Sequence, residues 1–345
     1  MNEKSVKFTG KRSVGLGHGS GGRLMHNLIK ELFLPRFKNP VLDKLADSAV
    51  IKLSQDELAF TTDSFVVSPL FFKGGDIGKL AVCGTLNDLV MLGAQPRFIA
   101  LAMIIEEGLD YDILARIADS IALVSREENV DIVTGDIKVV EKGACDKIFI
   151  TTSGIGTVIT KSGLSIESIR PEDKIIITGA IGEHGLSVVS GRKGVDLDFH
   201  IKSDCASLSG LLLPVVRKEW SVKFMRDPTR GGLATTLNEI SESCGLGIII
   251  EEEKIPVSGK VKVACELLGL DPLYVANEGK AVLVVGKKRA AAVLARLRKH
   301  PLGKSASIIG TVVRQPRGKV SLKTVAGGER IVDMLTSESL LPRIC

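Results

Sequence analysis

The last residue of this sequence is a cysteine, Cys345, which closes the stretch LLPRIC. Chain ends usually fray and tolerate change, so a terminal cysteine is either an accident of sequence or a thiol carried on a mobile arm. A carrier thiol needs a site elsewhere in the chain that it can enter. The other residues with chemical potential must therefore decide between these two interpretations.

Five aspartates lie in contexts typical of hard oxygen ligands, in predicted turns or at strand ends beside Ser, Thr or Gly. They are Asp47, Asp63, Asp88, Asp136 and Asp227. Mg²⁺ prefers a few carboxylates together with phosphate oxygens over an all-protein cage. Each aspartate taken singly is better explained as a cap or turn residue. The five together, alongside a glycine-rich segment, favour a nucleotide–magnesium site.

The glycine-rich segment is SVGLGHGSGGR at 13–23, and the glycines that we assign to nucleotide binding are Gly17, Gly19, Gly21 and Gly22. Closely spaced glycines expose backbone N–H groups that can wrap a polyphosphate. The segment is not a P-loop, because G-x-x-x-x-G-K-[ST] does not occur in the sequence. No apolar strand precedes it, as a dinucleotide fingerprint would require. A flexible N-terminal arm remains the alternative.

The stretch RDPTRGGLATTL at 226–237 predicts a tight turn that leads into a helix. A helix N-terminus presents unpaired N–H groups and a partial positive charge, which together attract anions. Arg226 and Arg230 flank the turn and could clamp a phosphate. An ordinary capped turn is the alternative.

The composition is that of an ordinary globular protein, with 345 residues, 44% of them apolar, and a net charge of +6. This length allows two domains. No apolar run reaches the roughly 18 residues of a membrane span, and the first residues lack the apolar core of a secretion signal, so we expect a cytoplasmic protein. The six cysteines form no CxxC pair, which argues against a zinc site and predicts reduced thiols. The basic residues are scattered, so nucleic-acid binding is not predicted.

The elements that would position the candidate residues begin with an α/β unit. Strands are predicted from β-branched and aromatic content at 57–67, 98–105 and 146–158, and a short strand leading into a loop at 130–136. A helix that ends on Gly93 is predicted at 78–94. A second helix at 111–129 follows from apolar residues that recur with the helical period.

A polar segment at 160–173 predicts a domain boundary, and a second α/β unit follows it. This unit starts with the stretch at 174–185. Its helices are predicted near 204–218, 232–244 and 288–299, and its strands near 247–252, 281–286 and 307–313. Residues 319–332 predict a hairpin that turns at Gly327-Gly328. We divide the chain into a glycine-rich arm (1–40), an N-terminal domain (41–160), a C-terminal domain (170–315), and a hairpin with the tail (316–345). His184 stands apart from the candidate residues and is interpreted as structural or surface.

The two units share a faint sequence similarity. Thr-Leu-Asn followed by an acidic residue occurs at 85–88 and again at 236–239, each time within a predicted helix that ends on glycine. Two copies of one α/β unit would explain this, and so would chance.

These stretches together resemble the AIR synthetase (PurM-like) ATP-binding superfamily, which also holds selenophosphate synthetase and thiamine-monophosphate kinase. Residues 61–96, TTDSFVVSPLFFKGGDIGKLAVCGTLNDLVMLGAQP, are similar to the N-terminal signature of that superfamily. Within it, the sequence looks like the carbamoyl dehydratases of hydrogenase maturation. The matching motifs are GHGSGGR, TGDIKVVEKG, RDPTRGGLA, ANEGK and the terminal PRIC, so the resemblance covers essentially the whole chain.

The resemblance implies an α+β fold of two α/β-type domains. The N-terminal domain would form a barrel with that of a second copy, giving a homodimer, while the C-terminal domain is an α/β sandwich and the tail is flexible. ATP would bind in a groove between the halves. The five aspartates match the magnesium ligands of the family. Asn87 and the glycine-rich segment match nucleotide-contacting positions, and we assign Gly135 and Arg230 to nucleotide binding with them.

The resemblance also implies a reaction, in which Cys345 matches the cysteine that carries the substrate. A carbamoyltransferase, HypF, would load it with a carbamoyl group, and the protein would use ATP to remove water and leave a thiocyanate. The cyanide would pass to the HypC–HypD iron scaffold complex, for the iron of [NiFe]-hydrogenase. Lys138 and Glu278 match polar residues near the docking point of the tail. We expect Glu278 to be the base and Lys138 to orient the amide, although these roles could be exchanged.

The tail carries further expectations. Pro342 predicts an extended arm, Arg343 could pair with acidic residues, and the apolar residues that would dock the arm are Leu340, Leu341 and Ile344. An exposed thiol has a pKa near 8.5, and the adjacent terminal carboxylate does not lower it, so we expect the loading partner to activate Cys345.

Two alternative functions remain. A selenophosphate synthetase would carry its reactive residue in the glycine-rich segment, which holds no cysteine, and a small-molecule kinase would not need Cys345. A nucleotide-binding scaffold without catalysis would use the tail as a docking peptide, and it would tolerate replacement of Cys345.

Overall fold

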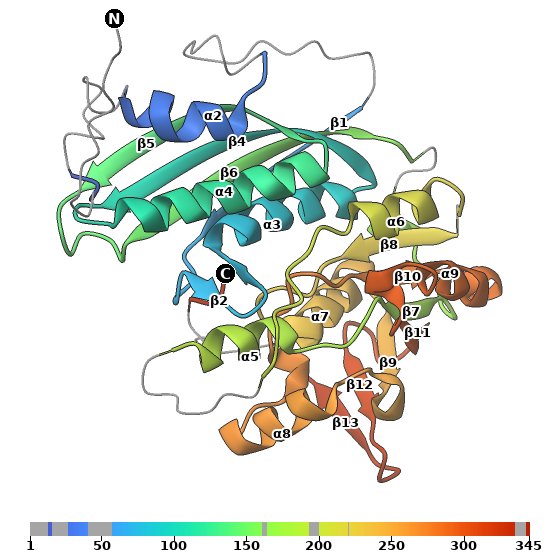
Figure 1. Cartoon of the computed structure of the whole chain (residues 1–345). Helices are drawn as coiled ribbons and strands as arrows, with labels where there is room; N and C mark the ends of the chain where they lie inside the picture. Colours follow the sequence, from blue (N-terminus) through green and yellow to red (C-terminus); the bar gives the residue numbers. More distant parts are fainter. Residues whose placement is uncertain are drawn as a thin grey trace, which may run out of the picture.

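Two α/β units, each built on its own β-sheet, make up the protein (Figure 1). The computed structural model describes residues 13–15, 27–40, 57–160, 164–192, 200–219, 221–334 and 343–345. The first sheet has four strands and the second has seven. A small ribbon of β2 (Phe71–Phe72) and β3 (Gly75–Asp76) follows the first strand.

The first sheet has the strand order β1-β6-β4-β5, with β4 and β5 parallel and the other pairs antiparallel. Its strands are β1 (Leu58–Phe65), β4 (Ala94–Glu106), β5 (Asp131–Val140) and β6 (Ile148–Val158). The strands predicted at 57–67, 98–105 and 146–158 are confirmed. The short strand predicted at 130–136 is confirmed as the first part of β5, but the loop predicted after it is wrong, because β5 stays paired with β4 as far as Val140.

Helices α3 (Ile77–Met91) and α4 (Tyr111–Glu127) lie on one face of this sheet, and both were predicted (Figure 1). The side chains of Asp76 and Asp110 cap their first turns, accepting backbone N–H groups at 2.7 Å from Gly78 and 2.9 Å from Asp112. Before the sheet, the chain forms a π-helical turn (Ile29–Phe33) and the short α2 (Leu34–Phe37).

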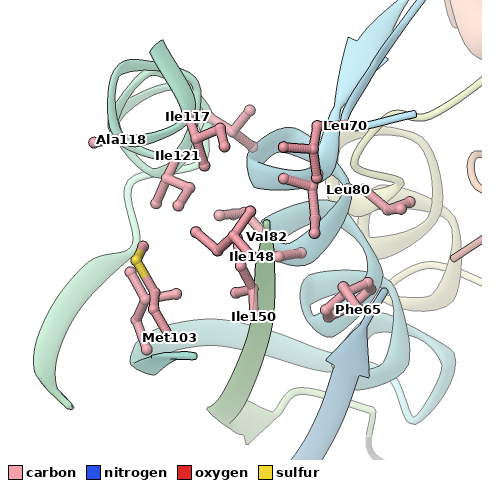
Figure 2. Close-up of a cluster of buried hydrophobic side chains, with 14 of the residues drawn as sticks. Phe65, Leu70, Leu80, Val82, Met103, Ile117, Ala118, Ile121, Ile148 and Ile150 are labelled. Carbon is pink, nitrogen blue, oxygen red and sulfur yellow. The ribbon is translucent and has the colours of Figure 1, made fainter. Parts of the chain in front are cut away.

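The apolar core of the first unit lies between the sheet and these two helices. Figure 2 shows Val82 of α3 beside Ile148 and Ile150 of β6, with Ile117 and Ile121 of α4 above them. The periodic apolar stripe predicted for α4 therefore faces the core. Helix α3 is buried on nearly all sides, because it also contacts the second unit through α6 and β8.

The opposite face of the first sheet keeps an apolar row exposed. Leu58, Phe60 and Ile104 are 41%, 66% and 44% exposed in the part of the chain that the structure describes. The strand register sets Phe60 and Phe98 on either side of Ile155 on this face. Such an uncovered apolar sheet face is unusual for a monomer.

The second sheet has the order β13-β12-β9-β11-β7-β10-β8, and every pair is antiparallel except β12 with β9. Its strands are β7 (Lys174–Ile177), β8 (Val222–Arg226), β9 (Gly247–Glu251), β10 (Val282–Val285), β11 (Ser307–Val313), β12 (Val320–Lys323) and β13 (Glu329–Val332). The predicted hairpin is confirmed as β12 and β13. The sequence set it apart from the C-terminal domain, whereas its pairing with β9 makes it part of that sheet.

The helices of the second unit are α5 (Glu183–Ser190), α6 (Ser209–Val216), α7 (Gly232–Cys244), α8 (Gly259–Leu268) and α9 (Ala290–Leu297). The predictions near 204–218, 232–244 and 288–299 are confirmed as α6, α7 and α9. Helices α5 and α8 were not predicted.

The shared Thr-Leu-Asn-acid stretches occupy α3 and α7, and their asparagines are used alike. Asn87 and Asn238 are both buried, and each donates its amide to a backbone carbonyl far away in sequence, on Ala206 at 3.1 Å and Val332 at 2.9 Å. This common use favours two copies of one unit, while the duplication itself stays a prediction.

Two further observations bear on the composition. Among the described helices, none has both the length and the apolar character that crossing a membrane requires. All six cysteines are free thiols, as predicted.

Candidate active site

The end of the chain is docked on the body of the same chain, and its anchor is Arg343. The guanidinium donates from Nε to the Val66 carbonyl at 3.2 Å and from Nη1 to Asp146 Oδ2 at 2.6 Å. The Arg343 carbonyl accepts from the Ser68 N–H at 3.1 Å and from Arg192 Nη2 at 3.2 Å. The hydrogen bond from Arg343 lowers the pKa of the Asp146 carboxyl. The predicted acidic partner of Arg343 is therefore Asp146.

Arg343 also turns the chain. Its φ of +56° lies in the left-handed region that side-chain-bearing residues rarely adopt, so the prediction of an extended arm is wrong at this residue. The four polar contacts of Arg343 hold the turn, which directs the next two residues inward. The expectations for Leu340, Leu341 and Pro342 lie outside the described residues.

Ile344 docks through both its side chain and its backbone. The side chain is 3% exposed and packs in the core of the first unit, as the apolar tail predicted. The Ile344 carbonyl accepts a hydrogen bond from Nε2 of His184 at 2.9 Å. His184 is fully buried, and this burial lowers its pKa, so the ring is neutral near pH 7. The structural interpretation of His184 is confirmed, but its contact with the tail was not predicted.

Cys345 lies beside Glu278. Burial, followed by the negative charge of Glu278, raises the pKa of the Cys345 thiol well above its ordinary value. Glu278 is 3% exposed, and its Oε1 atom has no hydrogen-bond partner among the described residues. Burial, with the charges of neighbouring aspartates, raises the pKa of Glu278 well above its ordinary value. The site therefore does not activate the free thiol, and activation by the loading partner stays a prediction.

Three of the five predicted aspartates gather at this site from different elements: Asp63 from β1, Asp88 from α3, and Asp227 directly after β8. Asp88 accepts from the Thr61 hydroxyl at 2.8 Å. Burial raises the pKa of all three, that of Asp227 to about 7, where the charge of Asp88 adds to the effect. The charge of Arg230 opposes the shift at Asp63. Crowded, partly dry carboxylates of this kind favour a bound cation.

The donor set fits Mg²⁺ as a partner of phosphate. Carboxylate oxygens are hard ligands, and Mg²⁺ usually takes only one or two of them together with phosphate oxygens and water. Within the described ranges, no three His, Cys, Asp or Glu side chains gather closely enough to hold a metal on their own. The aspartates would therefore hold the ion only together with oxygens from a bound polyphosphate.

Asp136 and Lys138 do not join this site within one chain. They lie in β5 opposite Ala102 and Ile104 of β4, on the sheet face turned away from α3, whereas Asp63 lies on the α3 side. Lys138 Nζ is 3.2 Å from Asp136 Oδ2, and both side chains are more than half exposed. A single chain therefore does not bring all the described candidate ligands together.

The remaining nucleotide-binding candidates divide into described and undescribed residues. A Cβ at Gly135 would overlap the Leu101 carbonyl across the sheet, which explains the glycine there. Its contact with nucleotide stays a prediction. Asp47 and the four candidate glycines, Gly17, Gly19, Gly21 and Gly22, lie outside the described residues.

The turn at 226–232 leads into α7 as predicted. Gly231 and Gly232 have φ values of +78° and +59°, and a Cβ at Gly232 would overlap the carbonyls of the loop at 273–275. Arg226, the last residue of β8, forms an ion pair at 2.9 Å with Glu239 of α7, so this pair ties the start of the turn to the helix that follows it. Arg230 is positioned at the N-terminus of a 13-residue helix, next to the aspartates.

The motif around Glu278 is fixed by buried charges that the sequence did not reveal. The Glu278 backbone N–H donates to Asp204 Oδ1 at 3.2 Å. Lys280 Nζ lies 3.1 Å from Asp204 Oδ2 and 3.8 Å from Glu183 Oε2. A Cβ at Gly279 would overlap the Asp204 carbonyl. Lys280 belongs to the quoted ANEGK motif and could have been singled out, whereas Asp204 lies in a stretch with no recognisable pattern.

Asn87 joins the two units at the same place. Its Nδ2 donates to the carbonyls of Ala206 at 3.1 Å and Glu278 at 3.4 Å, and its Oδ1 accepts from the Leu208 N–H at 2.8 Å. Asn87 thus ties α3 to the loop before α6 and to the backbone of Glu278. Its predicted contact with nucleotide stays a prediction.

Comparison with known proteins defines the class to which this fold and site belong. The models of the N-terminal and C-terminal domains of AIR synthase related proteins match residues 45–158 and 170–323. The carbamoyl dehydratase HypE of Azotobacter vinelandii is 48% identical over 333 residues, which are 96% of this chain and 97% of that protein. The chain belongs to the HypE family of carbamoyl dehydratases within the AIR synthase related proteins.

Solved structures agree with this assignment. The hydrogenase maturation protein HypE in complex with ATP is 47% identical, with a TM-score of 0.92 over 96% of this chain and 99% of that one. A HypE chain from a HypE–HypF complex is also 47% identical, with a TM-score of 0.78 over 89% of this chain and 99% of that one.

We predict that Asn87→Ala destabilises the protein and loosens the site. The backbone groups of Ala206, Glu278 and Leu208 would each lose a hydrogen bond, which costs about 1–3 kcal/mol, and the Glu278 carbonyl would keep only its bond from the Ala206 N–H. Urea unfolding would give the stability. The rate of alkylation of Cys345, measured on the C-terminal peptide by mass spectrometry, would report the docking of the tail.

Asn238→Ala is the matched control, because its two hydrogen bonds lie within the second unit. It should lower stability without changing the alkylation rate of Cys345. An Asn87→Ala protein that is as stable as the wild type, with Cys345 equally protected, would contradict the linking role of Asn87.

Proposed function

We propose that this protein removes water from a carbamoyl group carried on Cys345, at the expense of ATP, and leaves a thiocyanate that supplies cyanide to the iron of [NiFe]-hydrogenase. The observation that carries the proposal is the docking of Cys345 beside the unpartnered Oε1 atom of Glu278. The names of the relatives support the reaction class and the nucleotide.

The chemistry explains why these groups are needed. Converting R–S–C(=O)–NH₂ into R–S–C≡N removes one oxygen and two N–H protons. Amide oxygen is a poor leaving group, and ATP as co-substrate overcomes this when its terminal phosphoryl group is transferred to that oxygen. The oxygen then departs as phosphate, and ADP is the other product.

Glu278 is the proposed acceptor of an N–H proton. Its Oε1 is buried and has no hydrogen-bond partner in the described residues, and its carboxyl group lies beside the carrier cysteine. A general base works best when its pKa lies near the working pH, and burial raises the pKa of Glu278 in that direction. One proton would pass to Glu278, and the second would leave with phosphate or solvent.

The nucleotide is placed by the aspartates and the helix terminus. Asp63, Asp88 and Asp227 would hold Mg²⁺, together with Asp47 and Asp136 as the resemblance predicts. When bound, this ion supplies positive charge that offsets the charge of the phosphates. Arg230 and the N–H groups at the start of α7 would bind phosphate oxygens, with the glycine-rich segment and Gly135 as further contacts.

A homodimer built on the first sheet would complete the site. Its uncovered face carries Leu58, Phe60 and Ile104, which two copies could bury against each other to form a barrel. Asp136 and Lys138 lie on that same face. We propose that they serve the site through the dimer, with Lys138 orienting the amide, although the roles of Lys138 and Glu278 remain exchangeable.

The partners follow from the two ends of the reaction. HypF would load the carbamoyl group on Cys345, which the solved HypE–HypF complex of a relative supports. A HypC–HypD iron scaffold complex would accept the cyanide in the cytoplasm. Both transfers require the tail to leave the docked position, so the flexible arm predicted from sequence is part of the proposal.

We predict that Glu278→Gln accepts the carbamoyl group but dehydrates it about a hundredfold more slowly or worse, the range for loss of a general base. The variant keeps the shape of the side chain and removes the base. Intact-mass measurement after incubation with ATP, carbamoyl phosphate and HypF would follow first the adduct and then the loss of one water.

Glu253→Gln, on an exposed carboxylate, is the control and should behave like the wild type. Cys345→Ala should form no adduct. Wild-type dehydration by Glu278→Gln would rule out Glu278 as the base, and an adduct on Cys345→Ala would rule out the carrier role of Cys345.

For the dimer, we predict that Phe60→Asp yields monomers, because it places a charge in the apolar row that the two sheets would bury. Light scattering coupled to gel filtration would give the mass. Val325→Asp, at a site 73% exposed on the β12–β13 hairpin, should leave the dimer intact. A monomeric wild type would contradict this assembly.

A further inference from the structure

The docked tail is recognised through its backbone as well as through its side chains. The carbonyls of Arg343 and Ile344 are both bound, the first by the Ser68 N–H and Arg192 and the second by His184. These contacts do not depend on what the cysteine carries. The site can therefore hold the end of the chain in the same way whether Cys345 is free or loaded.

The bond from His184 has a fixed direction, because a chain of hydrogen bonds sets the tautomer of the ring. The Cys205 backbone N–H donates to Ser203 Oγ at 3.0 Å, so the Ser203 hydroxyl can donate to His184 Nδ1, 2.8 Å away. The proton of the neutral ring then sits on Nε2, which donates to the Ile344 carbonyl at 2.9 Å. The edge-to-face contact with Phe72, at 5.3 Å between centroids, holds the plane of the ring.

This bond lies one residue from the reacting group. The Ile344 side chain is buried beside it, so Ile344 is fixed on two sides, and the position of the Cys345 sulfur relative to Glu278 follows from it. The Arg343–Asp146 pair is different. Both side chains are more than one-third exposed, and exposed ion pairs give modest, reversible affinity.

We propose that His184 is a positioning residue that sets the register of the docked tail, so that the group on Cys345 faces Glu278, while Asp146 determines how much of the time the tail is docked. This inference rests on the proposed function and deepens it. A misplacement of about 1 Å in a reacting group can cost on the order of a hundredfold in rate. Register and occupancy should therefore respond to different substitutions.

The test compares three variants of the full chain by two measurements. His184→Gln keeps an N–H donor at the place of Nε2, His184→Asn is too short to reach the Ile344 carbonyl, and Asp146→Asn weakens the exposed anchor. The rate of alkylation of Cys345 without a carbamoyl group, ATP or partners gives the fraction of chains whose tail is docked. The single-turnover rate of water loss from the carbamoylated chain, followed by intact mass, gives the chemical step.

For Asp146→Asn we expect alkylation about two- to fivefold faster, as for loss of an exposed ion pair, and dehydration that falls only in proportion to the docked fraction. For His184→Asn we expect both measurements to change, with dehydration slowed by a further tenfold or so beyond the loss of docking, because a buried hydrogen bond is lost and the register with it. His184→Gln should restore most of the rate.

A folded His184→Asn variant whose dehydration falls no further than its docked fraction would overturn the proposal, as would a His184→Gln variant no better than His184→Asn. If His184→Asn does not fold, by its melting curve, Ser203→Ala replaces it, since it keeps the ring and removes the partner of Nδ1. We expect the same disproportionate slowing, and a wild-type rate would overturn the proposal.

The two measurements also separate this inference from the proposed function. If wild-type protein carries no carbamoyl group or loses no water, the proposed function fails. The alkylation arm still applies in that case, and equal protection of Cys345 in His184→Asn and in the wild type would overturn the role of His184 in docking.

Discussion

The concentration of buried and half-buried carboxyl groups around Cys345 is the constraint on which the rest of the structure depends. Asp63, Asp88, Asp227 and Glu278 all have pKa values raised first by burial, and for Asp88, Asp227 and Glu278 the charge of a neighbouring carboxylate comes next among the effects that raise the pKa. Ionised carboxylates that lie close together in a poorly solvated site raise the free energy of the folded protein unless cations lie beside them. A nucleotide would add more negative charge, so the same constraint that raises these pKa values also calls for a divalent cation.

The side chains of the protein supply only part of the positive charge that these carboxylates require. Lys280 forms an ion pair with Asp204, which binds the Glu278 backbone, and the positive charge of Arg230 favours the ionised form of Asp63. The backbone around Glu278 is held by Asp204 and Asn87, which come from the two sides of the domain boundary. The backbone of Glu278 is thus held in a fixed place, while the proposed reaction requires the chain end to leave its docked position. This division suits a reaction whose substrate arrives on the protein's own terminus.

The sequence predicted most of the strands and the helices α3, α4, α6, α7 and α9, because apolar periodicity and strand composition are local signals. It failed where pairing decided the outcome. Nothing in DIVTGDIKVV shows that the strand continues past Asp136, since that depends on the partner strand β4. The placement of the site residues could not be predicted for the same reason. Asp63 and Asp136 lie on opposite faces of one sheet, and the face of a strand residue can be assigned only once the order and register of the strands are known.

The residues of the candidate site likewise fall into those that the sequence could identify and those that it could not. Residues inside recognisable motifs, such as Glu278, Asp227 and Cys345, could be named and were brought together. His184, Asp204 and Asp146 could not be assigned their contacts, because each acts through a backbone atom or a charge distant in sequence. The left-handed turn at Arg343 also lay beyond sequence reasoning, since it is held by four contacts from outside the tail.

The central claim is that the amide oxygen on Cys345 leaves as phosphate in the site beside Glu278. The most direct measurement loads Cys345 with a carbamoyl group whose oxygen is isotopically labelled, adds ATP, and follows the label by mass spectrometry. The account predicts that the label appears in inorganic phosphate in step with formation of the thiocyanate on the C-terminal peptide. Label released into water, or ADP formed while the labelled carbamoyl group stays on the protein, would contradict it.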